Sequence, residues 1–110
     1  MTFFSRIAAL ATALVLAAAP LAARAQKPPV FVLNSLDASV SMIDPVSWKE
    51  IKRIPTGKEP HHLYLTPDEK SLMIANAAGD SLLFLDPRTG DVQRTVRGII
   101  DPYQLRFSPD

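Results

Sequence analysis

The sequence repeats itself at a spacing of 42 positions, and this repeat limits the possible folds more than any other feature. Aligning residues 30–68 with residues 72–110 gives eight identical pairs, which are Asn34/Asn76, Ser39/Ser81, Asp44/Asp86, Pro45/Pro87, Pro60/Pro102, Leu63/Leu105, Pro67/Pro109 and Asp68/Asp110. Between these pairs we expect the register to slip by one position, so that Ile51 corresponds to Val92 and Gly57 to Gly98. Repeats of about 20–50 residues are typical of chains built from stacked supersecondary units.

Each unit reads as short strands separated by turn residues. Residues 30–33 form a β-branched and aromatic run, and residues 39–43 alternate between polar and apolar side chains. Asp44 followed by Pro45 predicts a type I turn, and Gly90 suits a left-handed residue in the matching turn. Further strands are expected at residues 50–54, 62–66, 91–96 and 104–107. Four short strands in a unit of about 40 residues predict an all-β fold made of β-propeller blades.

The repeat units resemble the YVTN-type β-propeller repeat family. The segments that carry the resemblance are Val32–Asn34, Val40–Pro45, Ile54–Gly57 with Pro60, and Thr66–Asp68. That family is similar in turn to the cytochrome d1-type haem domain and to other exported propellers, so the resemblance implies seven blades at full length. The matched residues are turns and strand cores, which makes the resemblance informative about fold rather than function.

The first 25 residues have the organisation of a secretory signal peptide. Arg6 precedes an apolar run from residue 7 to residue 22, and Ala23-Arg24-Ala25 supplies the small residues that a signal peptidase accepts. We therefore expect cleavage after Ala25, a periplasmic or secreted protein, and a partial propeller over residues 26–110 without a membrane span. The alternative is an uncleaved anchor helix, although the run is shorter than the roughly 20 apolar residues that cross a bilayer.

The charge that remains after cleavage is close to neutral. Of the 12 basic residues only Arg6 and Arg24 lie in the first 25 positions, so 10 basic and 11 acidic residues remain. Nucleic-acid binding is therefore not expected, because it needs a basic surface. The chain has no cysteine, which excludes disulfides and thiolate attachment of a metal or haem within these residues.

The strands expected here do not add up to a closed ring. Residues 30–54 supply three strands, residues 62–96 four and residues 104–107 one, whereas propellers typically contain about four to eight blades. In the families that the chain resembles, the missing innermost strand of the first blade is commonly supplied by the C-terminus of the chain. We expect the chain to be an N-terminal fragment of a longer product, and a homo-oligomer that builds a ring from such pieces is the alternative.

Few side chains are candidates for a functional site. His61 and His62 follow Pro60 where the first strand of a blade enters the central channel, and either could contact haem iron or another cofactor. Tyr103 and Gln104 hold the same positions in the next unit and are expected to form part of a ligand or partner surface. The competing interpretation is that all four are ordinary repeat positions. No catalytic residue or metal-binding motif is expected.

Three functions remain compatible with the sequence. The leading hypothesis is a non-enzymatic exported propeller that binds an unknown protein or small-molecule ligand at its channel mouth. The second is a redox or haem-handling protein resembling the cytochrome d1-type domain, with His62 or His61 at the iron. The third is a propeller hydrolase of the lactonase kind, which would need acidic metal ligands from several blades.

Overall fold

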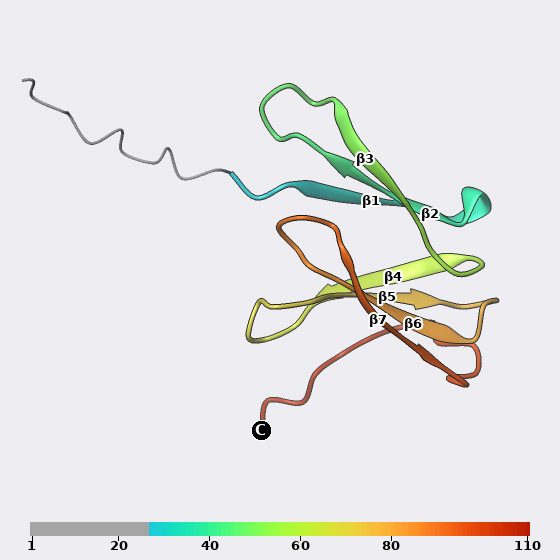
Figure 1. Ribbon diagram of the computed structural model, residues 1–110. Coiled ribbons are helices and arrows are strands. Elements are labelled where there is room, and N and C mark those ends of the chain that lie inside the picture. Colours follow the sequence, from blue (N-terminus) through green and yellow to red (C-terminus); the bar gives the residue numbers. More distant parts are fainter. Residues whose placement is uncertain (1–26) are drawn as a thin grey trace, which may run out of the picture.

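The computed structural model describes residues 27–110, and the expected signal peptide lies outside the described residues. The chain forms two antiparallel sheets (Figure 1). The first contains β1 (Val30–Asn34), β2 (Ser39–Ile43) and β3 (Glu50–Pro55), with a 3-10 turn η1 (Ser35–Asp37) between β1 and β2. The second contains β4 (Pro60–Leu65), β5 (Leu72–Asn76), β6 (Ser81–Leu85) and β7 (Val92–Arg97) in that order. The expected all-β fold of partial propeller blades is confirmed.

The two sheets follow the repeat without the one-position slip that the sequence suggested. Glu50 pairs with Ile43 in the first sheet, and Val92 pairs with Leu85 in the second, so Val92 corresponds to Glu50 and not to Ile51. Both sheets carry a β-bulge immediately before this pair. A bulge adds one residue to one strand of a pair. Because the bulge recurs at the same position in both units, both units have the same length and the spacing stays at 42.

The strand expected at residues 104–107 is wrong for this structure, which has no regular secondary structure from Pro102 onward. A β-strand is defined by backbone hydrogen bonds to a neighbouring strand. Residues 102–107 pair with no strand of the described chain, because its two sheets contain only β1–β3 and β4–β7. The segment instead runs back along the second sheet toward the C-terminus (Figure 1).

An apolar core lies between the two sheets. It consists of buried side chains from both sheets, namely Val40, Met42, Ile54, Leu72, Ile74, Leu83 and Leu85. Residues paired across neighbouring strands point to the same face, so the pairing of Ile74 with Leu63 and Leu83 defines the inner face of the second sheet. The core therefore joins the three-stranded partial blade to the four-stranded blade.

Each sheet also has an outer face, which points away from this core. In the second sheet it carries His62, Tyr64, Met73, Ala75, Leu82, Phe84, Arg94 and Val96. In the first sheet it carries Val30, Val32, Asn34, Ser39, Ser41, Glu50 and Arg53. Glu50 accepts a hydrogen bond from Ser41 and pairs with Arg53, whose guanidinium also contacts Asp37 at 3.0 Å.

Left-handed backbone positions repeat at the same spacing as the strands. Positive φ angles occur in pairs 42 positions apart at Ala38/Asp80, Trp48/Gly90 and Glu59/Asp101. A non-glycine residue with positive φ costs roughly 1–2 kcal/mol. The tertiary fold therefore imposes these turns even where the sequence supplies a large side chain, as at Trp48.

The Asp-Pro turns form as expected. The Asp44 carboxylate accepts hydrogen bonds from the backbone N–H groups of Val46 and Ser47 at 2.7 and 2.8 Å, and Asp86 does the same for Arg88 and Thr89. The N–H of Ser47, followed by that of Val46, holds the pKa of Asp44 below its ordinary value of 3.8.

Acid is expected to weaken the fold through the Asp44 carboxylate. Because the pKa of Asp44 is lower in the folded chain than in the unfolded chain, its stabilisation is complete above the ordinary value and is lost as the pH falls through the folded value. Asn at this position keeps an accepting oxygen but does not titrate. In urea unfolding, the free energy of unfolding should therefore fall less between about pH 6 and pH 2 for Asp44→Asn than for the wild type. Equal losses would contradict this assignment.

Candidate functional site

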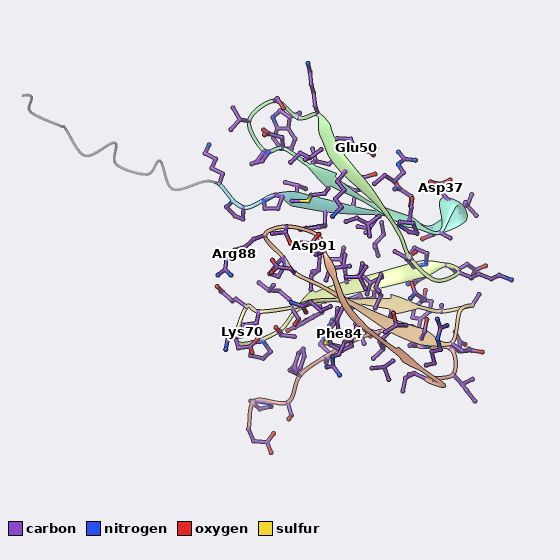
Figure 2. The ribbon with its side chains drawn as sticks, viewed as in Figure 1. Asp37, Glu50, Lys70, Phe84, Arg88 and Asp91 are labelled. Atoms are coloured by element: carbon purple, nitrogen blue, oxygen red, sulfur yellow. The ribbon has the colours of Figure 1, made fainter. Side chains whose placement is uncertain are left out.

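The candidate residues lie at the loop end of the sheets where β4 begins. This end also carries η1 and the loops that follow β3, β5 and β7, as the right side of Figure 1 shows. The opposite end carries the Asp44 and Asp86 turns and the loop after β4. Figure 2 shows Asp37 at the first end, and Lys70 and Arg88 at the second. In a propeller the first strand of each blade lies next to the central channel, which is why the sequence led to the expectation that the first residues of β4 lie at a channel mouth.

His61 and Tyr103 are brought together by the fold. Their ring centroids lie 3.9 Å apart at an angle of 32°. His61 occupies a β-bulge, because the register of β4 shifts between Pro60 and His62. A bulge redirects a side chain relative to the strict alternation of a strand. Both rings remain open to solvent at this end, with Tyr103 exposed by 62%.

His62 contacts the same C-terminal segment by hydrogen bonds. The backbone N–H of Leu105 lies 3.3 Å from Nδ1 of His62, and an Nη of Arg106 lies 3.5 Å from Nε2. The two neighbours are both donors, whereas a neutral imidazole has only one accepting nitrogen. Accepting from Leu105 places the ring proton on Nε2. The His62 side chain is half-buried, and this hydrogen bond holds the segment at residues 105–106 in place.

Gln104 is exposed, and the hydrogen bonds of residues 27–110 include none to its side chain. Three contact residues were not singled out from the sequence: Leu105, Arg106 and Phe107. Phe107 packs against Tyr64 with ring centroids 5.6 Å apart, and the Arg106 guanidinium lies 5.9 Å from the centre of the Tyr64 ring. Their positions in the repeat could have indicated them, since residues 105–107 correspond to residues 63–65 of β4.

The surroundings of the two histidines indicate whether either ring could ligate iron. A ligating imidazole needs an unprotonated nitrogen directed at the metal. Leu105 takes the accepting nitrogen of His62 and Arg106 faces the other, so His62 does not fit that role. His61 has no hydrogen bond to its ring nitrogens within the described residues, although its ring face lies against Tyr103. Residues 27–110 contain no group of three or more potential metal ligands.

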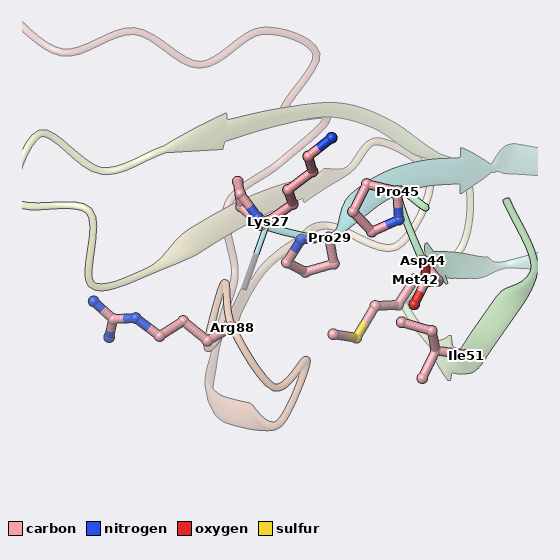
Figure 3. A pocket seen from close by; sticks show the side chains of 8 residues that line it. Lys27, Pro29, Met42, Asp44, Pro45, Ile51 and Arg88 are labelled. Carbon is pink, nitrogen blue, oxygen red and sulfur yellow. The ribbon is translucent and has the colours of Figure 1, made fainter. Parts of the chain in front are cut away.

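A cavity of about 260 Å³ lies at the opposite end of the sheets (Figure 3). Its walls come from the segment before β1, the Asp44 turn and the Arg88 turn, namely Lys27, Pro28, Pro29, Met42, Asp44, Pro45, Ile51 and Arg88. The guanidinium of Arg88 points away from Met42 and Ile51 in this view. The cavity contains none of the four candidate residues. Within the described chain, no helix is long and apolar enough to cross a membrane.

The chain is similar to several solved structures. The hydrazine synthase of Kuenenia stuttgartiensis superimposes with a TM-score of 0.57 at 22% identity, over 66% of this chain and 20% of that one. The dihydro-haem d1 dehydrogenase NirN, in complex with DHE, gives 0.56 at 24% identity, over 64% and 15%. The Pseudomonas aeruginosa periplasmic gluconolactonase PpgL gives 0.49 at 26% identity, over 64% and 22%.

These likenesses concern the arrangement of strands. The chain spans no more than 22% of the length of any of these three proteins. No curated protein matches it. Residues 3–110 match the sequence family described as YNCE-like beta-propeller, which agrees with the repeat and with the two sheets. The chain belongs to the YNCE-like β-propeller family.

Proposed function

We propose that this chain is part of an exported, non-enzymatic β-propeller that binds a protein or small-molecule partner at the channel-mouth end of its blades. The observation that carries the proposal is the solvent-facing pair of His61 and Tyr103 at the first residues of β4. Tyrosine combines a large apolar ring with a hydroxyl group, and such residues are enriched at binding surfaces. Contact between the two tilted rings holds them in one orientation, which reduces the entropy lost on binding.

Further apolar side chains face solvent at the same end. Leu36 in η1 and Ile100 in the loop after β7 are among the most exposed residues of the structure. Exposed apolar patches with polar neighbours mark protein interaction sites or ligand-binding grooves. Together with Tyr103 they give this end of the blades a surface suited to a partner that is partly apolar.

The binding surface can be tested with a double variant. Immobilised wild type, His61→Ala/Tyr103→Ala and Lys70→Ala are compared for capture from the periplasmic extract of the source cell, with proteins and small molecules quantified by mass spectrometry. Lys70 lies at the opposite end and serves as the control (Figure 2). We expect the double variant to lose at least about tenfold in captured partner, because aromatic anchors commonly contribute more than 1 kcal/mol. Equal capture by all three proteins would contradict the proposal.

The haem-handling alternative is tested by measuring haem binding. Titration of the wild type, of His61→Ala and of His62→Ala with haemin is followed by the Soret absorbance. Because His62 has no free accepting nitrogen, we expect no stoichiometric complex that depends on His62. A stoichiometric spectrum that disappears in either variant would replace the proposed function by the haem-handling one.

Export is proposed from residues 1–25. The expected result is that protein recovered from the periplasm begins at Gln26, shown by N-terminal sequencing or intact mass. The variant Ala25→Arg should retain the first 25 residues, because the peptidase requires a small residue at this position. Wild-type protein that keeps its first residue in a membrane fraction would support the uncleaved anchor instead.

A further inference from the structure

A second pocket lies between the two sheets, and both of its walls belong to the described chain. Its volume is about 280 Å³. The loop after β3 forms one wall, and residues of the second sheet form the other. Of these, Asn76, Ser81 and Leu83 are buried, whereas Thr95 and Arg97 are exposed. The pocket therefore has a buried inner part and an opening to solvent, and it includes none of the four candidate residues.

The inner part of this pocket contains a buried amide oxygen without a hydrogen-bond donor. Asn76 is 1% exposed, and its Nδ2 donates to Oγ of Ser81 at 3.2 Å. Its Oδ1 accepts no hydrogen bond from residues 27–110. Buried side-chain oxygens are in large majority hydrogen-bonded, because an unpaired one has lost its contacts with water and gained none. A donor that the described residues do not supply is therefore expected at Asn76.

The equivalent residues of the first sheet complete their hydrogen bonds with carboxylates. Nδ2 of Asn34 donates to the hydroxyls of Ser39 and Ser41. Those hydroxyls in turn donate to Asp37 at 2.8 Å and to Glu50 at 2.6 Å. Because each hydroxyl has a single proton, both serines must accept from the amide, which fixes the nitrogen of the amide on the serine side. The same orientation of the amide recurs in the second sheet.

The second sheet lacks the partners of that network. Asp37 corresponds at the repeat spacing to Gly79, where a Cβ atom would lie 2.8 Å from a backbone nitrogen of the loop after β3. Ser41 corresponds to Leu83, which has no polar side-chain atom. With no carboxylate beside it, the Ser81 hydroxyl donates no hydrogen bond within the described chain. An unpaired acceptor and an unpaired donor therefore lie side by side, next to an apolar side chain.

A positive charge lies on the open side of the same face. Ser81 pairs with Asn76 on one side and with Arg97 on the other, so the three side chains point to one face of the sheet. Neighbouring strands are about 4.7–4.9 Å apart, which places Asn76 and Arg97 within reach of one small molecule. Arg97 forms no ion pair with residues 27–110. Because a guanidinium group binds a carboxylate through two parallel hydrogen bonds, an acidic ligand group is expected there.

We propose that this pocket binds a short hydroxycarboxylate. The hydroxyl group of the ligand donates to Oδ1 of Asn76 and accepts from the hydroxyl of Ser81. Its carboxylate pairs with Arg97, and its carbon chain lies on Leu83. An ammonium group would also donate to Asn76, but it has no acceptor for the Ser81 proton, which favours a hydroxyl over an amine. The competing occupant is a water molecule alone, since buried waters commonly satisfy such groups.

Binding is tested on protein recovered from the periplasm, with the three positional isomers of hydroxybutyrate as probes. Saturation-transfer NMR gives the dissociation constant of each probe. Butyrate lacks the hydroxyl group, and butanediol lacks the carboxylate. We expect at least one hydroxybutyrate to bind saturably and both control compounds to bind at least about tenfold more weakly, because each leaves protein groups without their partner.

The arginine is tested with a matched pair of variants. Arg97→Gln should weaken binding of the same isomer at least about tenfold, because it removes the charged partner of the carboxylate. Arg88→Gln should bind it as the wild type does, since Arg88 is also exposed but lies at the opposite end of the sheets (Figure 2).

Three results would overturn the proposal. They are a lack of binding for all three isomers, which leaves water as the occupant, equal binding of butyrate, and equal binding by Arg97→Gln and the wild type. Partner capture by the His61→Ala/Tyr103→Ala variant is a separate measurement on a different surface, so this proposal and the proposed function can fail independently.

Discussion

Gly90→Ala is expected to lower the free energy of unfolding by about 2–4 kcal/mol. The backbone of Gly90 has a φ of +72°, where a Cβ atom costs roughly 1–2 kcal/mol. That Cβ would also lie 2.8 Å from Cδ1 of Ile54 and 3.1 Å from Sδ of Met42, both of which are buried in the core between the sheets. Forcing additional volume into a packed core costs about 1–2 kcal/mol more, the lower part of the usual range, because the contacted atoms belong to side chains that can shift.

Gly98→Ala is the matched control for this prediction. Gly98 has a similar φ of +80°, but a Cβ placed there meets no atom within 4 Å. Gly98→Ala should therefore lower the free energy of unfolding only by the cost of the left-handed backbone, about 1–2 kcal/mol. Urea unfolding followed by circular dichroism measures both variants. If the two glycine variants lose the same free energy, the turn at Gly90 does not pack against the first sheet as described.

Ile74→Ala should lower the free energy of unfolding by about 2–5 kcal/mol, the range measured for large-to-small changes in protein cores. The Ile74 side chain is fully buried at the centre of β5, between the two sheets. Removing its terminal carbons leaves a cavity that neighbouring strands cannot close without breaking their register. Thermal or urea unfolding at low protein concentration gives the loss directly.

Val32→Ala tests the same repeat position in the other sheet. Val32 corresponds to Ile74, but it lies on the outer face of the first sheet and is 46% exposed. We expect a loss of less than about 1 kcal/mol when the protein is dilute, because little burial is removed. A large loss in dilute solution would mean that Val32 is already covered within one chain.

Local chemistry explains which parts of the fold could be predicted. β2 has the bounds that the alternation of residues 39–43 indicates, and Asp44 binds the backbone N–H groups of its turn as an Asp-Pro sequence favours. β4 begins two residues earlier than expected, at Pro60. The sequence predicted the strands but not the two bulges at equivalent positions of the repeat, because a bulge changes the pairing of the backbone without any characteristic side chain.

The candidate site was predicted only in part. The repeat placed His61 and Tyr103 at equivalent positions of successive units, and the structure brings their rings into contact. It did not show that Leu105 and Arg106 surround the His62 ring, since that contact joins residues more than 40 positions apart. Gln104 and His62 hold equivalent positions in the repeat, yet Gln104 is exposed and His62 anchors the C-terminal segment.

The sequence by itself determined the kind of unit this protein is built from. Turn residues, strand composition and a regular repeat act over a few positions, so they can be recognised without coordinates. The tertiary structure decided which equivalent positions are buried. Ile74 and Val32 share a place in the repeat but differ in exposure, because one sheet has a neighbour on that face and the other does not. Burial depends on what packs against a residue, and no local pattern contains that information.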